Sequence, residues 1–127
     1  MEKFDLTYSN QSSEYLLSKP EELVRYTNLM TLVLSNRQLT HLPPEIGHLS
    51  NLQYLYLDRN QLTHLPAEIG QLTKLKELYL HHNQLTTLPN EIRHLTELQE
   101  LILAHNRFSN DEKEHIKALL PDCKIVF

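Results

Sequence analysis

The chain of 127 residues contains two glycines, one cysteine and no tryptophan. Two glycines cannot build a glycine-rich phosphate-binding loop, and neither an H-E-x-x-H nor a G-x-S-x-G motif occurs. We therefore expect no enzymatic activity and no cofactor. The single cysteine, Cys123, excludes an intramolecular disulfide and a cysteine-based zinc site. Because Cys123 precedes an apolar end at residues 125–127, we expect a buried structural thiol rather than a reactive one.

Positive charge and long apolar runs are also scarce. Lys and Arg number 12 against 16 Asp and Glu, which gives a formal net charge of −4. Without a net positive field to attract phosphates, we expect no nucleic-acid partner. No apolar run approaches the roughly 20 residues that span a bilayer, and residues 1–5 lack the basic region of a signal peptide. We therefore expect no membrane insertion and, by default, a cytoplasmic location, with secretion by another route left open.

Leucine, in contrast, recurs at a fixed period. Shifting the chain by 23 residues superimposes LQYLYLDRNQLTHLPAEI on LKELYLHHNQLTTLPNEI almost residue for residue. Units begin at Leu29, Leu52, Leu75 and Leu98 and follow L-x-x-L-x-L-x-x-N-x-L-x-x-L-P-x-x-I-x-x-L. A fixed period of this length indicates a solenoid, in which each unit buries its apolar face against its neighbours.

This pattern resembles the leucine-rich-repeat family over residues 19–108. The L-P-x-E-I variant and the tail that follows it are similar to small bacterial leucine-rich-repeat proteins of the kind numerous in spirochaetes. The resemblance implies an α/β solenoid, wound as a right-handed superhelix with a curved parallel β-sheet on its concave face and short 3-10 or helical turns on its convex face. It also implies that the protein binds proteins or peptides.

The strand of each unit can be read from the residues themselves. In Leu78-Tyr79-Leu80 the two leucines share one face and the tyrosine takes the other, because side chains alternate along a strand. Equivalent strands 23 residues apart run parallel at a spacing of about 4.8 Å. Each column of the repeat alignment therefore becomes a row of side chains in space, with leucines inside.

The convex side is predicted to be thin. Pro66 fixes φ at the start of a short turn, and the spacing of three between Ile69 and Leu72 favours a 3-10 helix over a long α-helix. Gly47 and Gly70 follow this turn, and we expect them to relieve the next bend.

Three segments follow from the pattern: an N-terminal cap at residues 1–28, repeats at 29–108 and a C-terminal helix–strand cap at 109–127. The N-terminal cap is expected to contain a degenerate repeat, with residues 8–28 partly helical. The apolar residues expected to cover that end are Phe4, Leu6, Tyr15, Leu16 and Leu17. At the other end, Ser109 and Glu112 have the spacing of a capping box, which predicts the start of a helix.

An asparagine follows each of three strands, at Asn60, Asn83 and Asn106. A buried amide can pair with loop N–H and C=O groups, so we predict a structural asparagine ladder along the solenoid. The first unit has Arg37 in this column, which predicts an irregular start. Because an unpaired buried cation is costly, we expect Arg37 to reach solvent or an acid.

The concave face is built from the non-leucine positions of the strands and of the loops after them. Tyrosine and arginine are common at energetically important interface positions, although the β propensity of tyrosine explains exposed tyrosines equally well. We predict that this face contacts the protein or peptide partner. The predicted contact residues are Val33, Tyr54, Tyr56, Asp58, Arg59, Glu77, Tyr79, His81, His82, Glu100, Ile102 and His105.

The size of this face limits the partner. Five or six strands, each exposing roughly 12 Å, give on the order of 300 Å², against about 800 Å² per partner in a standard interface. We therefore expect an extended peptide, a partner of modest affinity, or recruitment of the rim residues Arg59, His82 and His105.

The histidines suggest a second hypothesis. His82 and His105 share a column and His81 is adjacent, so the three could approach one metal ion. Such a site could join copies of the chain, and the alternative to a binding module is therefore a self-assembling structural protein linked through caps, edge strands or metal. We expect a monomer that holds no resident metal, with these histidines on the surface.

Overall fold

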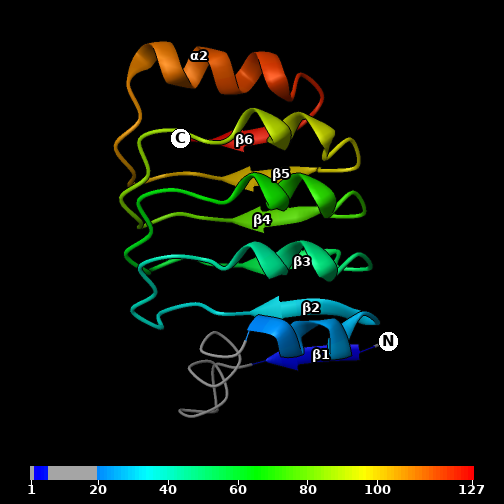
Figure 1. Ribbon diagram of the computed structural model, residues 1–127. Helices are drawn as coiled ribbons and strands as arrows, with labels where there is room; N and C mark the ends of the chain where they lie inside the picture. Colours follow the sequence, from blue (N-terminus) through cyan, green and yellow to red (C-terminus); the bar gives the residue numbers. More distant parts are fainter. Residues whose placement is uncertain (1, 6–19) are drawn as a thin grey trace.

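The computed structural model describes residues 2–5 and 20–127 (Figure 1). Its centre is a six-stranded sheet in which neighbouring strands are all parallel and follow the order of the chain. The strands are β1 (Glu2–Asp5), β2 (Leu29–Val33), β3 (Tyr54–Tyr56), β4 (Glu77–Tyr79), β5 (Glu100–Ile102) and β6 (Lys124–Val126). The parallel solenoid predicted from the repeat period is confirmed.

Short 3-10 helices form a second layer on one side of the sheet (Figure 1). They are η2 (Pro20–Tyr26), η3 (Pro44–His48), η4 (Ala67–Gln71) and η5 (Asn90–His94). In η4, Pro66 precedes the helix with extended backbone, and the Ile69 N–H donates to the Pro66 carbonyl at 3.1 Å. The Leu72 N–H then donates to the Ile69 carbonyl at 3.2 Å, which is the i to i+3 pattern that the spacing of three predicts.

The register of the sheet matches the repeat period. Tyr54 lies opposite Glu77, and Tyr56 lies opposite Tyr79, in adjacent strands. The Leu57 N–H continues this pairing beyond β3, because it donates to the Tyr79 carbonyl at 2.8 Å. Side chains separated by 23 residues are therefore neighbours along the solenoid.

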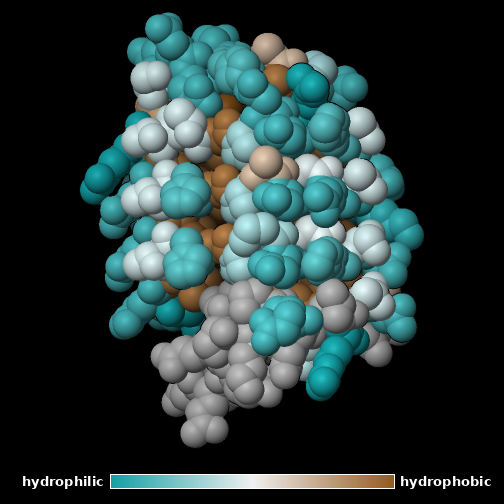
Figure 2. All heavy atoms as spheres, in the orientation of Figure 1, coloured by the Kyte–Doolittle hydropathy of each residue, from teal (hydrophilic) through white to brown (hydrophobic). Residues whose placement is uncertain are grey.

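Leucine and isoleucine fill the space between the two layers. Leu55, Leu57 and Leu62 of one coil are completely buried, as are Leu78 and Leu80 of the next. Each Å² of apolar surface that is buried contributes about 25 cal/mol of stability, so this continuous core is the main stabilising contribution. Seen from the side of the 3-10 turns, the surface is mostly polar, with hydrophobic side chains visible in a narrow band (Figure 2).

Gly47 and Gly70 allow successive coils to approach closely, and the prediction that they relieve a bend is wrong. Neither has a positive φ, so a side chain would not be excluded by backbone conformation. A Cβ added to Gly70 would lie 2.6 Å from the carbonyl oxygen of Glu91 in the next 3-10 turn. Arg93 occupies the equivalent position of the third full repeat, where helix α2 (Asn110–Leu119) follows in place of another such turn, and it is exposed.

The last coil is covered by α2, which lies across one end of the stack (Figure 1). The Ser109 hydroxyl accepts a hydrogen bond from the Glu112 N–H at 3.1 Å, as the capping-box spacing predicts. Ile116 of the helix and Leu120 after it are buried in the core. None of the helices in the described part of the chain combines the length and apolarity that crossing a bilayer requires.

At the opposite end, residues 2–5 form strand β1 and pair with β2. The sequence predicted apolar cover in this region but not a strand. Most of the residues on which that prediction depended, Leu6 and Tyr15 to Leu17, lie outside the described residues, as does most of the segment expected to be partly helical. Within that segment, residues 20–26 form the 3-10 helix η2.

Arg37 departs from expectation. Its Nε and Nη2 atoms are buried and have no hydrogen-bond partner among the described residues, so the prediction that it reaches solvent or an acid is wrong for these two atoms. The reason is that its column faces the interior in every coil. The first coil also has a second residue of positive φ, Gln38 at 59° beside Asn36 at 58°, which gives the ladder the irregular start that was predicted.

Candidate functional site

The face of the sheet opposite the 3-10 turns carries the predicted contact residues. Because leucines point into the core, the alternate side chains of each strand point out, and those of Val33, Tyr54, Tyr56, Tyr79 and Ile102 are half-buried there. The strand register arranges the outward side chains of the strands in two parallel rows. One row contains Thr31, Tyr54, Glu77, Glu100 and Lys124, and the other contains Val33, Tyr56, Tyr79, Ile102 and Val126.

Hydrogen bonds between coils fix two of the tyrosines. The Tyr56 hydroxyl donates to Glu77 Oε1 at 3.0 Å, and the Tyr79 hydroxyl donates to Glu100 Oε1 at 2.7 Å. The two tyrosine rings lie 4.8 Å apart between centroids at an interplanar angle of 55°. We call these four residues the Tyr–Glu ladder. Each ring is therefore held by its neighbour and by a carboxylate of the following coil.

The ladder shifts the ionisation of both tyrosines. Burial, followed by the hydrogen bond to Glu77, raises the pKa of Tyr56 to about 12. The hydrogen bond to Glu100, followed by burial, raises the pKa of Tyr79 still further. Because a carboxylate accepts only from a protonated hydroxyl, both tyrosines are neutral donors throughout the physiological range.

Lys124 extends this face and was not predicted as part of it. Its Nζ lies 3.5 Å from Glu100 Oε2, and β6 places it in the row of Glu77 and Glu100. The hydrogen bond from Tyr79, and then the charge of Lys124, lower the pKa of Glu100 despite an opposing effect of burial. The repeat pattern could not find Lys124 because it lies 24 residues after Glu100, outside the 23-residue period.

Asp58 organises the loop end of the same face. The Ser35 hydroxyl donates to Asp58 Oδ1 at 2.7 Å, while His81 Nε2 and Arg59 Nε lie 3.5 and 3.8 Å from Oδ2. The Asp58 side chain is only 13% exposed, and these contacts offset part of the cost of removing its charge from water. Nδ1 of His81 is buried and lacks a hydrogen-bond partner among the described residues.

Arg59, His82 and His105 form a third row, which we call the cationic stripe. All three have left-handed backbone, with φ of 60°, 60° and 59°. The imidazole rings of His82 and His105 are stacked, with centroids 4.3 Å apart and planes at 21°. Their side chains are exposed. The sequence predicted the row but not its backbone; the signal it offered is the absence of β-branched residues, which tolerate positive φ poorly, from this column.

The histidines are stacked rather than convergent. In residues 2–5 and 20–127, no group of three or more His, Cys, Asp or Glu side chains is placed to hold a metal ion. Imidazole lone pairs lie in the plane of the ring, so the stacked rings of His82 and His105 direct them along parallel planes. Partial loss of hydration beside the neighbouring side chains, and then the charges of His105 and Arg59, lower the pKa of His82.

The asparagine ladder lies directly beneath the cationic stripe. Asn83 Nδ2 donates to the carbonyls of Leu57 and Leu80, both at 3.0 Å, and Oδ1 accepts from the Leu62 N–H at 3.0 Å. Asn60 and Asn106 make the equivalent bonds in the neighbouring coils. Each amide therefore joins two coils and fixes the loop from which the stripe projects.

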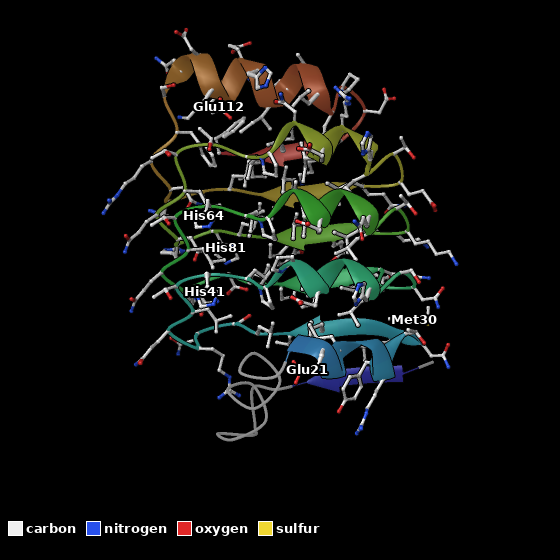
Figure 3. All side chains as sticks on the ribbon, in the orientation of Figure 1. Glu21, Met30, His41, His64, His81 and Glu112 are labelled. Atoms are coloured by element: carbon white, nitrogen blue, oxygen red, sulfur yellow. The ribbon has the colours of Figure 1, made fainter. Side chains whose placement is uncertain are left out.

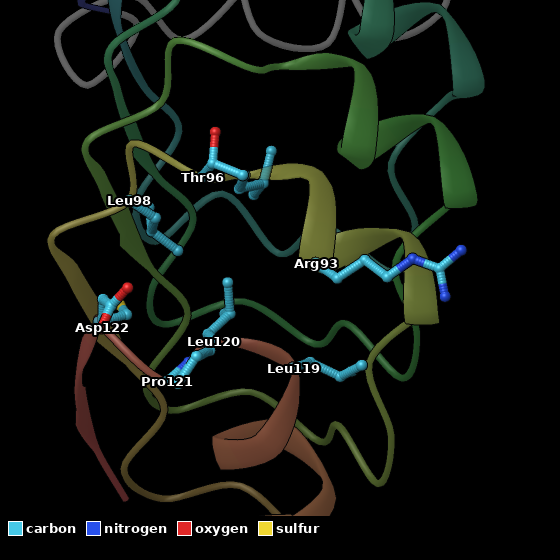
Figure 4. A pocket seen from close by; sticks show the side chains of 9 residues that line it. Arg93, Thr96, Leu98, Leu119, Leu120, Pro121 and Asp122 are labelled. Carbon is cyan, nitrogen blue, oxygen red and sulfur yellow. The ribbon is translucent and has the colours of Figure 1, made fainter.

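A separate pocket of about 200 Å³ lies between the last full repeat and the end of α2 (Figure 4). Its lining is largely apolar and includes Leu98, Leu119, Leu120 and Cys123. Burial raises the pKa of the Cys123 thiol to about 11, so the thiol is protonated at neutral pH and is a poor nucleophile.

Known proteins share this architecture. The sequence profile of the leucine-rich repeat region matches residues 4–120. A leucine-rich-repeat protein of Leptospira interrogans is 51% identical over 84% of this chain, with a TM-score of 0.82. An internalin of Listeria monocytogenes is 28% identical over 83% of the chain, with a TM-score of 0.67. The plant peptide hormone receptor RGFR1, solved in complex with RGF2, is 30% identical over 83% of the chain, also with a TM-score of 0.67.

These proteins are much longer than the chain, which covers 27%, 32% and 17% of their respective lengths. No match was found among curated protein sequences. The profile match spans most of the chain, and the repeats it describes are the coils of the observed sheet. The chain belongs to the leucine-rich-repeat family and is similar to its bacterial members.

Proposed function

We propose that the concave face of this chain binds an extended segment of a protein or peptide. The observation that carries the proposal is the Tyr–Glu ladder. Tyr56 and Tyr79 are aromatic side chains on an open face, and their hydroxyls are fixed before any partner arrives. A side chain that is already ordered loses little conformational entropy on binding, so such tyrosines favour affinity.

Related proteins support the same type of partner. The receptors RGFR1 and PEPR1 were solved with RGF2 and AtPEP1, and Toll was solved with Spatzle. The family typically provides non-catalytic interaction modules, and we propose the same for this chain. Because these neighbours indicate ligand binding, we do not propose the alternative of a self-assembling structural protein.

The face is small, so the proposed partner is an extended segment rather than a folded domain. A projected area on the order of 300 Å² is well below the 800 Å² of a standard interface. Recruitment of Arg59, His82 and His105 beside the ladder would widen the contact, and we include these residues in the proposed site.

The test is a double substitution, Tyr56→Ala with Tyr79→Ala. The matched control is His41→Ala with His64→Ala, two exposed rings on successive coils in the loops between the sheet and the 3-10 turns (Figure 3). Proteins captured from cell extracts by the wild-type chain should be lost with the tyrosine variant and retained with the control. Circular dichroism must show that both variants are folded. Equal capture by the tyrosine variant would move the binding site elsewhere.

A further inference from the structure

We propose that the cationic stripe, Arg59, His82 and His105, binds the carboxylates of an acidic peptide segment. This inference rests on the proposed function, because it specifies the chemistry of the peptide that the concave face would bind. Three observations carry it: the geometry of the stripe, the use of the nearby carboxylates, and the groups that face the histidines.

The backbone conformation of the repeat determines the geometry of the stripe. Its three residues occupy one column on three successive coils and share a left-handed conformation near φ 60°. Residues other than glycine are uncommon in this conformation, with asparagine, aspartate and histidine the most frequent among them, and such residues often cluster at binding sites. The stack of His82 on His105, with centroids 4.3 Å apart, arranges the two rings side by side.

The carboxylates of the same face are occupied within the protein. Glu77 and Glu100 accept hydrogen bonds from Tyr56 and Tyr79, and Glu100 is also paired with Lys124. Asp58 accepts from Ser35 and lies within 3.8 Å of Arg59 and His81.

The cations of the stripe have no comparable partners. Within the described residues Asp58 is the carboxylate paired with Arg59, and the Arg59 side chain remains 57% exposed. His82 and His105 have no carboxylate within 4 Å in the same part of the chain. The exposed donors of the stripe are therefore the groups of this face with the fewest partners in the described residues, and they complement the carboxylates of an acidic segment.

Protonation links the stripe to pH. The charged groups that face His82 are His105, Arg59 and His81, which oppose its protonation, and Asp58, which favours it. A carboxylate placed on the stripe would offset the repulsion that His82 experiences from the neighbouring cations and raise the pKa of His82. Binding would then take up protons, so affinity should increase as pH falls through the histidine range.

The test uses fluorescein-labelled hexaglutamate, with hexalysine and hexaserine peptides as controls. Fluorescence anisotropy at pH 5.5 should show binding of hexaglutamate to the wild-type chain that is at least tenfold tighter than at pH 7.5. A tenfold change is expected because uptake of one proton can alter affinity by up to tenfold for each pH unit. The two control peptides should bind at least tenfold more weakly than hexaglutamate at pH 5.5.

The variant is His82→Asn with His105→Asn, because asparagine adopts the left-handed conformation readily and should preserve the fold. Its affinity for hexaglutamate at pH 5.5 should fall at least tenfold. The matched control is His41→Asn with His64→Asn, which removes two exposed histidines outside the stripe and should bind like the wild type. Arg59→Asn is a second, independent variant, and it should weaken binding at both pH values.

Three results would overturn the proposal: no hexaglutamate binding at pH 5.5, equal binding at both pH values, or undiminished binding by the His82 and His105 variant. These results concern the stripe alone. Retention of the natural partner by the Tyr56 and Tyr79 variant would instead remove the tyrosine site and leave the hexaglutamate measurement unaffected, so the two failures are distinguishable.

Discussion

The Tyr79 hydroxyl donates a hydrogen bond to Glu100 Oε1 at 2.7 Å, joining side chains that belong to neighbouring coils. The bond crosses from one row of the concave face to the other, because Tyr79 lies opposite Ile102 while Glu100 lies opposite Glu77. The same diagonal joins Tyr56 to Glu77 one coil earlier. The proposed contact surface is thus braced along its length.

Removing the Tyr79 hydroxyl should reduce stability in a pH-dependent way. The pKa of Glu100 is lowered from its usual 4.5, first by this hydrogen bond, so the carboxylate contributes stability above that value and loses it as pH falls through the folded pKa. We expect Tyr79→Phe to lower the urea midpoint at pH 7, and the difference from wild type to narrow below about pH 4. A constant difference from pH 7 to pH 3 would contradict the assignment.

Asn83→Ala should destabilise the protein by on the order of 3 kcal/mol, because it leaves the Leu57 and Leu80 carbonyls and the Leu62 N–H without their partner. The control is Asn90→Ala, which removes an exposed amide whose contact is with His115 at 2.9 Å and should cost less than about 1 kcal/mol. Urea unfolding at neutral pH measures both. Similar losses for the two variants would show that the ladder is not specially stabilising.

Gly70→Ala should cost about 2 kcal/mol, because the new methyl group would meet the Glu91 carbonyl of the next coil at 2.6 Å. Arg93→Ala is the matched control, since it introduces the same residue at the equivalent position of the next repeat, where a Cβ is already accommodated. It should change the free energy of unfolding by less than about 0.5 kcal/mol. Thermal unfolding by calorimetry compares the two, and an equal effect at both positions would refute the close-approach explanation.

The left-handed backbone at Arg59 should make that position sensitive to branching at Cβ. Arg59→Val should be less stable than Arg59→Asn by about 1–2 kcal/mol, because valine at a φ of 60° places its Cβ substituents against the backbone. Arg107→Val, at an exposed position that lacks positive φ, should change stability by less than about 0.5 kcal/mol. Chemical denaturation of all three variants decides the matter; equal stability of the two Arg59 variants would argue against strain.

The sequence predicted the sheet and its rows because the repeat is nearly identical from coil to coil. Once Tyr56 and Tyr79 share a position in a 23-residue period, parallel stacking makes them neighbours. The inward leucines and the 3-10 turns follow from spacing alone. These features are shared by successive repeats, so the repeat pattern of the sequence is sufficient to predict them.

The remaining features of the site depend on three-dimensional contacts that the repeat pattern of the sequence does not contain. The Tyr–Glu hydrogen bonds require a diagonal between two rows, which alignment of columns cannot show. Lys124 was missed because the C-terminal cap departs from the period, and β1 was missed because residues 2–5 lack the leucine pattern of the other strands. At Arg37 the prediction failed for a different reason. The cost of burying an unpaired cation led us to expect contact with solvent or an acid, but Arg37 lies in an inward-facing column and two of its nitrogens are buried.

The substitution of arginine for glycine at position 93 has a consequence for lengthening the protein. At Gly47 and Gly70 the position after the isoleucine lacks a side chain, which lets the next 3-10 turn pack closely behind it. An extra 23-residue unit should therefore be accommodated when it is inserted ahead of the coil that contains Arg93. The same unit placed behind that coil would force the arginine against incoming backbone, so growth of the array is directional.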